Sequence, residues 1–390
     1  MKRLLSAGLT LSLLYPLAAS AGQVSDSLSV TGFFSLDATY TNNAEASIPR
    51  PQGKDSDLDE NEVNFDSSVY GARADLDIYS GLGASLQVVG TKQTDDSYDP
   101  EVEWAYLKYD FANDLSVRAG QLKLPFLKGT ELRYIGNARL WARPIVPING
   151  AGGFDIFRGA EVYYNTYYGD YDIQLHASLG EPEHDLDFIQ DTWLALVSAE
   201  VDSGDGTIRL SLLQAGFDIY SKDNELLYDN SSLKMGSLEG EYQWDNWVAH
   251  GGIATGTAYS HPDEYLAYLS LGYRFDRFTP YALYSRKVMT FESLAFFGEA
   301  DGDQLNEEGG GESELPSGSR PPEPAPEPVE EQDGERIENT VAIGVRYDLA
   351  PNLSVKFQWD YQEVNDKSWV GQPDRDIQSN IYTIVFEGVF

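Results

Sequence analysis

The sequence predicts an all-β fold, a sixteen-stranded antiparallel transmembrane β-barrel with an inward-folded third external loop. Three observations predict the barrel. Apolar and polar residues alternate with a period of two along most of the chain, several alternating runs are long, and short connections alternate with long ones. A tilted membrane strand needs about 9–11 residues, whereas soluble strands are commonly about 5 or 6 residues long. A soluble β-sandwich also alternates, but it gives no reason for connection lengths to alternate.

The composition narrows the class of protein. The 390 residues include 63 acidic and 27 basic side chains, no cysteine and 13% aromatic residues, of which tyrosine is the most frequent. The lack of cysteine excludes a disulfide-stapled domain, and the net charge of −36 argues against nucleic acid as a partner. Beyond residue 21 no long apolar run appears, which excludes a helical membrane protein. Abundant tyrosine and glycine are typical of outer-membrane barrels, which carry aromatic girdles at both interfaces.

The N-terminal 21 residues have the pattern of a secretory signal peptide. Lys2 and Arg3 supply the positive charge, residues 4–17 are mostly apolar, and residues 19–21 (Ala-Ser-Ala) form a small-residue cleavage site. The apolar part is shorter than the roughly 20 residues of a spanning helix. We therefore expect a cleaved signal peptide over residues 1–21 and a barrel over residues 22–390. Such a protein would cross the inner membrane and reside in the outer membrane of a Gram-negative bacterium.

Sixteen alternating runs account for the expected strands, an even number that places both termini on one side of the membrane. Their centres are expected near Phe34, Ala74, Val88, Leu107, Val117, Val162, Leu175, Val197, Leu210, Gly240, Gly251, Leu271, Leu283, Ile343, Phe357 and Ile384. In the run near residue 343, Val341, Ile343 and Val345 are expected to face lipid and Thr340 and Arg346 to face water.

The connections support the same architecture. Every second one is a short turn with Gly, Asn, Asp or Pro chemistry, as at residues 80–83, 169–170 and 350–352. Most of the others are longer. The longest, residues 299–338, holds 14 acidic and two basic residues and is crowded with proline. It is too polar to pack a core, so we expect a disordered external loop.

The C-terminal run is apolar on one face, where Tyr382, Ile384, Phe386 and the terminal Phe390 lie. A final apolar strand that ends in phenylalanine resembles the sorting signal of proteins inserted by the outer-membrane assembly machinery. We therefore expect that machinery, acting through Phe390, and outer-membrane lipid as partners.

Motifs that carry chemistry are scarce. None of the four histidines lies in a metal-ligand spacing, and no nucleophile elbow or phosphate-binding glycine loop occurs. His176 alternates with apolar residues on the polar side of its run, and a water-filled lumen explains it without catalysis. We expect no enzymatic activity, no cofactor and no metal.

One segment departs from the acidic character of the chain. Residues 118–158 carry seven bases and two acids. The candidate bases at a pore constriction, where they would face anions, are Arg118, Lys123, Lys128, Arg133, Arg139 and Arg143. Fixed bases in a narrow passage with low-dielectric walls favour anions. The alternative is that some of these bases pair with acids on the opposite wall, which leaves only a field across the pore.

Part of this segment resembles a known family. Residues 117–126 resemble a strand-end motif of the phosphate- and polyphosphate-selective porins, Arg-x-Gly-x-x-Lys-x-Pro-Phe, and residues 103–109 resemble the strand before it. The motif maps onto Arg118, Gly120, Lys123, Pro125 and Phe126. The resemblance implies an outer-membrane porin that assembles as a homotrimer and whose third long connection folds into the barrel. The acidic chain and the long acidic loop depart from the phosphate-selective members, which leaves the solute open.

Two functions follow from these observations. The first is passive diffusion of small hydrophilic solutes, including ions with a modest preference for anions, among which phosphate-like anions are candidates. The polar residues expected inside most strands favour this function. The second is a non-conducting surface barrel that serves as an adhesin or structural protein, with the acidic loop as its binding element.

Overall fold

The structure is a computed structural model that describes residues 22–43, 61–92, 98, 100–143, 156–183, 189–220, 226–258, 261–291, 334–367 and 374–390. The expected signal peptide and residues 299–333 of the expected acidic loop lie outside these described residues. Within the described residues, no helix is long and apolar enough to span a membrane.

The described residues are almost entirely strands. The strands are β1 (Gly22–Ser25), β2 (Leu28–Thr41), β3 (Val63–Asn64), β4 (Val69–Tyr79), β5 (Leu82–Thr91), β6 (Pro100–Asp110), β7 (Leu115–Lys123), β8 (Ile156–Tyr168), β9 (Tyr171–Pro182), β10 (Ile189–Asp202), β11 (Gly206–Tyr220), β12 (Leu226–Trp244), β13 (Trp247–Ala258), β14 (His261–Tyr273), β15 (Phe278–Phe291), β16 (Gly334–Ala350), β17 (Leu353–Lys367) and β18 (Arg375–Val389).

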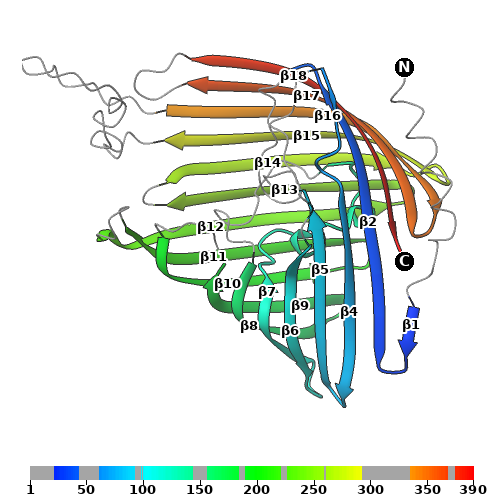
Figure 1. Cartoon of the computed structure of the whole chain (residues 1–390), viewed down its shortest axis with the longest axis vertical. Coiled ribbons are helices and arrows are strands. Elements are labelled where there is room, and N and C mark those ends of the chain that lie inside the picture. Colours follow the sequence, from blue (N-terminus) through cyan, green and yellow to red (C-terminus); the bar gives the residue numbers. More distant parts are fainter. Residues whose placement is uncertain are drawn as a thin grey trace, which may run out of the picture.

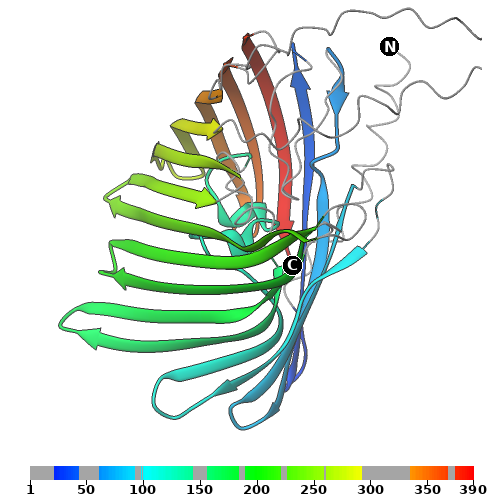
Figure 2. The same ribbon diagram turned by 90° about the vertical axis from the view of Figure 1, so that its left-hand side faces the viewer.

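Sixteen long strands form a closed antiparallel barrel. Strand β2 pairs with β4, each strand from β4 to β17 pairs with the next, and β18 pairs back with β2. The first and last long strands therefore lie side by side, as Figure 1 shows for β2 in blue beside β18 in red. Strands β1 and β3 are short additions, both paired with β2. Figure 2 shows how the wall curves from the cyan strands through green to red.

This architecture confirms the predicted sixteen-stranded barrel. Each expected strand centre falls inside one long strand, and the short turns occur where the turn residues predict them. The turns use the left-handed backbone conformation that glycine and aspartate tolerate, with φ of 79° at Gly81, 63° at Gly169 and 51° at Asp245.

The two faces of the wall differ in chemistry, because successive side chains of a strand point to opposite sides. On β17, Ser354, Lys356 and Asp360 are buried, whereas Phe357 on the other face is 42% exposed. On β18, Thr383 is buried and Ile384 is 53% exposed. We call these the polar face and the apolar face of the barrel. An exposed apolar face is the surface that a bilayer can cover.

Aromatic side chains gather beside the short turns. Exposed members are Tyr79, Tyr109, Phe111, Tyr167, Tyr168, Tyr171, Tyr242, Trp244, Trp247, Phe275 and Phe278. The Trp244 and Trp247 rings of neighbouring strands stack 6.0 Å apart, and the Tyr109 and Phe111 rings at the end of β6 meet edge to face, 4.6 Å apart. Rings with an apolar body suit the boundary between hydrocarbon and headgroups.

Two details differ from the sequence prediction. Residues 334–338, expected at the end of the acidic loop, begin β16 instead, because Glu338 pairs in register with Lys287 of β15 and its side chain is buried beside Arg336. In addition, the polar face of β10 to β12 is apolar over part of its length. Leu196, Leu213 and Phe217 are buried there in a hydrophobic core, although most inward residues were expected to be small and polar.

Candidate functional site: the segment between β7 and β8

The segment that follows β7 lies against the polar face of the barrel wall. We refer to residues 124–143 as the β7–β8 segment. It contains two short 3₁₀ helices, η2 (Thr130–Leu132) and η3 (Gly136–Ala138). Its side chains and backbone contact residues of β11, β12, β15, β16 and β17, which are not neighbours of β7 in the sheet. The segment therefore joins distant parts of the wall.

The beginning of the segment is anchored by apolar packing. Leu124 and Phe126 are each 1% exposed and belong to a core that includes Trp104 of β6, Phe157 of β8 and Leu196 of β10. Further members of this core come from β11 to β14. The core explains why the polar face of β10 to β12 carries leucines and phenylalanine: these side chains form the seat of the segment.

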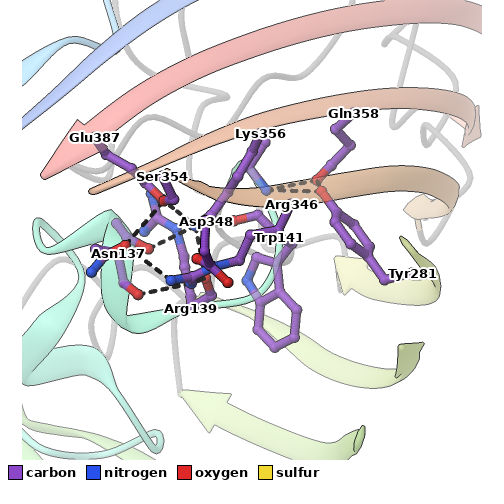
Figure 3. A network of polar contacts seen from close by, with 12 residues as sticks. Asn137, Arg139, Trp141, Tyr281, Arg346, Asp348, Ser354, Lys356, Gln358 and Glu387 are labelled. Atoms are coloured by element: carbon purple, nitrogen blue, oxygen red, sulfur yellow. Dashed lines mark hydrogen bonds and ion pairs between the residues drawn. The ribbon is translucent and has the colours of Figure 1, made fainter. Parts of the chain in front are cut away.

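The end of the segment is anchored by two cations of the wall. Lys356 of β17 donates hydrogen bonds from Nζ to the carbonyl oxygens of Gly136 (2.8 Å), Arg139 (2.7 Å) and Trp141 (3.3 Å). Arg346 of β16 donates from Nη1 to the carbonyl oxygens of Asn137 (2.8 Å) and Arg139 (2.9 Å). Figure 3 shows both side chains beside this turn of the chain.

These cations have carboxylate partners of their own. The Lys356 ammonium forms an ion pair with Glu387 of β18, and both side chains are fully buried. Arg346 Nε lies 2.7 Å from Asp348, and Arg346 Nη2 donates to the side-chain oxygen of Asn137 at 3.0 Å. We refer to Arg346 and Lys356 as the clamp.

A third set of contacts holds the last residues of the segment. The Ala142 backbone N–H donates to the Tyr281 hydroxyl (3.1 Å) and to Gln358 Oε1 (2.9 Å). Arg143 is buried and forms an ion pair with Asp360 of β17. The segment is thus fixed at its beginning by apolar burial and at its end by hydrogen bonds and ion pairs.

Two of the predicted constriction bases lie on β7 itself. Arg118 forms an ion pair with Glu161 of β8 at 3.0 Å, and its guanidinium lies 4.6 Å from the centre of the Tyr163 ring. Lys123 is fully buried and forms an ion pair with Glu103, and its Nζ lies 4.7 Å from the centre of the Tyr134 ring. Both bases are therefore compensated by wall carboxylates and aromatic faces.

The next two predicted bases lie within the segment. Lys128 Nζ lies 3.5 Å from Glu241 of β12 and also donates to the hydroxyl of Thr207 of β11. Arg133 donates to the Tyr134 hydroxyl at 2.9 Å, and its guanidinium lies 4.8 Å from the centre of the Tyr134 ring.

Arg139 donates from Nη1 to the Arg133 carbonyl oxygen at 2.8 Å. Removal of its guanidinium from water lowers the pKa of Arg139, and the carboxylates of Glu387 and Asp37 oppose this shift. Asp37 of β2 interacts electrostatically with both Arg139 and Arg143.

Two of the six predicted bases lie on β7, Lys128 lies beside β11 and β12, Arg133 contacts Tyr134 within the segment, and Arg139 and Arg143 lie beside carboxylates of β2, β17 and β18. Four of them, Arg118, Lys123, Lys128 and Arg143, form ion pairs with wall carboxylates. That arrangement corresponds to the alternative in which bases pair with acids. The prediction that the six bases face anions stays a prediction.

Sequence reasoning missed the clamp and its partner Glu387. These residues occupy polar positions of alternating strands and carry no motif that separates them from other polar positions. The density of bases in residues 118–158 identified the segment but not its anchors. Among the described residues, no group of three or more His, Asp or Glu side chains is placed to hold a metal ion.

Comparison with solved structures shows which fold this is. The chain is similar to the outer membrane channel DcaP of Acinetobacter baumannii, with a TM-score of 0.58 and 13% identity over 95% of this chain and 100% of that one. It is also similar to an anion-selective porin from Comamonas acidovorans, with a TM-score of 0.55 and 10% identity over 93% of this chain and 99% of that one.

A third similar structure is the trimer form of OmpT of Vibrio cholerae, with a TM-score of 0.53 and 12% identity over 94% of this chain and all of that one. No family model and no curated protein sequence matches the chain. The fold is therefore that of outer-membrane porins, while the predicted link to the phosphate-selective family is not established by these comparisons.

Proposed function

We propose that this protein is an outer-membrane porin for passive diffusion of small hydrophilic solutes, in which the β7–β8 segment narrows the lumen. The observation that carries the proposal is the position of this segment on the polar face, held to β11, β12 and β15 to β17. A closed barrel of sixteen strands leaves room for an aqueous channel, and a segment attached to distant parts of its inner wall reduces the cross-section.

The ion pairs limit the charge selectivity of this pore. A base beside a carboxylate contributes little net potential at a distance, so the basic segment supports at most a modest preference for anions. Arg133, Arg139 and Arg143 are the bases whose removal tests this part of the proposal. The similarity to an anion-selective porin at 10% identity concerns the fold and agrees with this preference without specifying a solute.

The decisive measurement is planar-bilayer recording of the full chain. We expect stepwise conductance and a reversal potential in a KCl gradient that indicates a modest anion preference. Replacement of Arg133, Arg139 and Arg143 with alanine should move the reversal potential toward cation selectivity. The matched control is Lys367→Ala, since Lys367 lies at the far end of β17 with its side chain 67% exposed. A cation-selective wild type whose triple variant is unchanged would mean that acidic residues elsewhere set the selectivity.

The second function, a non-conducting adhesin or structural barrel, is distinguished from a porin by the same recording, because it requires that no stepwise conductance appears at any voltage.

We further propose that the protein is inserted through its C-terminal phenylalanine by the assembly machinery and forms a homotrimer. The trimeric form of a structure with the same fold supports the oligomer, and cross-linking of the membrane-embedded protein tests it.

A further inference from the structure

Two cations of the barrel wall, Arg346 and Lys356, donate hydrogen bonds to backbone carbonyl groups of the β7–β8 segment and form ion pairs with carboxylates of the wall. An ammonium group has three protons to donate, and Lys356 Nζ has three carbonyl acceptors in the segment in addition to the Glu387 carboxylate. With the side chain fully buried, no donor remains for a solute. Lys356 is therefore not a selectivity residue, although it is a cation on the polar face.

Burial of this lysine requires compensation. An isolated ammonium in a low-dielectric interior costs several kcal/mol, and a carboxylate partner with further hydrogen bonds offsets that cost. The compensating acceptors are the carbonyl groups of Gly136, Arg139 and Trp141, in and just after η3, and the Gly136 carbonyl also accepts from the Arg139 N–H at 3.0 Å. The turn and the lysine thus satisfy each other's hydrogen-bonding groups.

Arg346 makes the same kind of contact from the next strand. Its two Nη atoms engage the Asn137 backbone, the Asn137 side chain and the Arg139 carbonyl. Ser354 of β17 donates to the same Asn137 side chain at 3.0 Å. Figure 3 shows these groups converging on one turn of the segment.

The clamp acts on only half of the segment. The beginning is held by the apolar core around Leu124 and Phe126, which no clamp residue contacts among the described interactions. Loss of the clamp should therefore loosen residues 136–143, which only the wall contacts of Ala142 and Arg143 would then hold, while the barrel and the beginning of the segment stay in place.

We propose that Arg346 and Lys356 are positioning residues that hold residues 136–143 against the wall and thereby fix the width of the pore. The inference rests on the proposed porin function for its effect on conductance. It predicts that pore width depends on side chains that contact no solute.

The main test removes the buried pair without changing the net charge, in the variant Lys356→Met with Glu387→Gln. The matched control is Lys287→Met with Glu264→Gln, which removes another pair of the polar face, 3.6 Å apart on β15 and β14. In planar bilayers we expect the clamp variant to show larger and more variable conductance steps than the wild type. The control variant should show wild-type steps.

A second readout does not depend on conductance. The chain has no cysteine, so Ala142→Cys introduces a unique thiol at a position that is 2% exposed. We expect slow maleimide labelling in the otherwise wild-type protein and labelling on the order of tenfold faster in the clamp variant, equivalent to about 1.4 kcal/mol. Labelling in the control variant should stay slow.

These readouts separate the two proposals. Accelerated labelling without any conductance in the wild type would support the clamp and refute the porin function. Unchanged labelling and unchanged conductance in a clamp variant that retains heat-modifiable migration on gels would overturn the clamp.

If the double variant does not fold, Arg346→Lys provides the same test. It retains the charge but cannot reach Asn137 and Arg139 from two nitrogens at once. Faster labelling at position 142 supports the clamp, and unchanged labelling overturns it.

Discussion

Phe126 offers the sharpest test of how the β7–β8 segment is seated. Its ring is 1% exposed within the core formed with Trp104, Phe157 and the leucines of β10 and β11. Phe126→Ala removes this ring and leaves a cavity between segment and wall. A buried Phe→Ala substitution costs about 3–5 kcal/mol, from lost apolar burial and from the cavity.

The free energy of unfolding can be measured in detergent micelles by denaturant titration, with the fluorescence of the seven tryptophans as the signal. The matched control is Leu132→Ala, because Leu132 lies in the same segment but is 42% exposed. We expect a loss of about 3–5 kcal/mol for Phe126→Ala and below about 1 kcal/mol for Leu132→Ala. Equal losses for the two variants would refute the apolar anchor.

Three further predictions concern the wall and the long acidic loop. Gly120→Ala should lower the free energy of unfolding by about 1–3 kcal/mol, because φ is 144° there and a Cβ would collide with the Ala105 carbonyl. The measurement is the midpoint temperature of the thermal gel shift. The control is Gly236→Ala, where a Cβ would lie 3.5 Å from Leu212. Lys123→Met should lower the free energy of unfolding, measured by denaturant titration, by about 3–5 kcal/mol, because it leaves the Glu103 carboxylate buried and unpaired. Adding Glu103→Gln should restore much of the lost free energy. Deletion of residues 299–333 should leave heat-modifiable migration intact, and its loss would show that these residues are needed for the barrel.

The barrel could be predicted from the sequence because the alternation that specifies it is visible within each single strand. A wall with one face in lipid imposes a period of two on each strand, and runs such as residues 353–362 display that period directly. The turns are equally local, since left-handed positions such as Gly81 and Asp245 call for particular residue types. Strand count and connection order therefore followed without any knowledge of long-range contacts.

The polar anchors of the β7–β8 segment could not be predicted, because they depend on which polar positions, distant in sequence, come together in the folded wall. Lys356 and Glu387 look like ordinary polar positions of their strands, and only the register of β17 with β18 brings them together. The ion pairs of Arg118 and Arg143 have the same origin. The excess of bases indicated a special segment, but its compensation is a property of the folded wall.

The pairing of β18 with β2 also governs when the barrel can form. Phe390 and Gly32 exchange backbone hydrogen bonds of 2.8 and 2.7 Å, and the hydroxyls of Thr39 and Thr383 lie 3.1 Å apart although 344 positions separate them in sequence. No local contact can substitute for this seam, and contacts of such separation form slowly. Until the last strand arrives, both ends of the unfinished sheet expose unpaired backbone groups, which hydrocarbon does not tolerate. The topology therefore sets the order of folding and insertion: the barrel cannot close in the membrane before β18 pairs with β2, and until then the unpaired edges must lie in water or be bound by another protein.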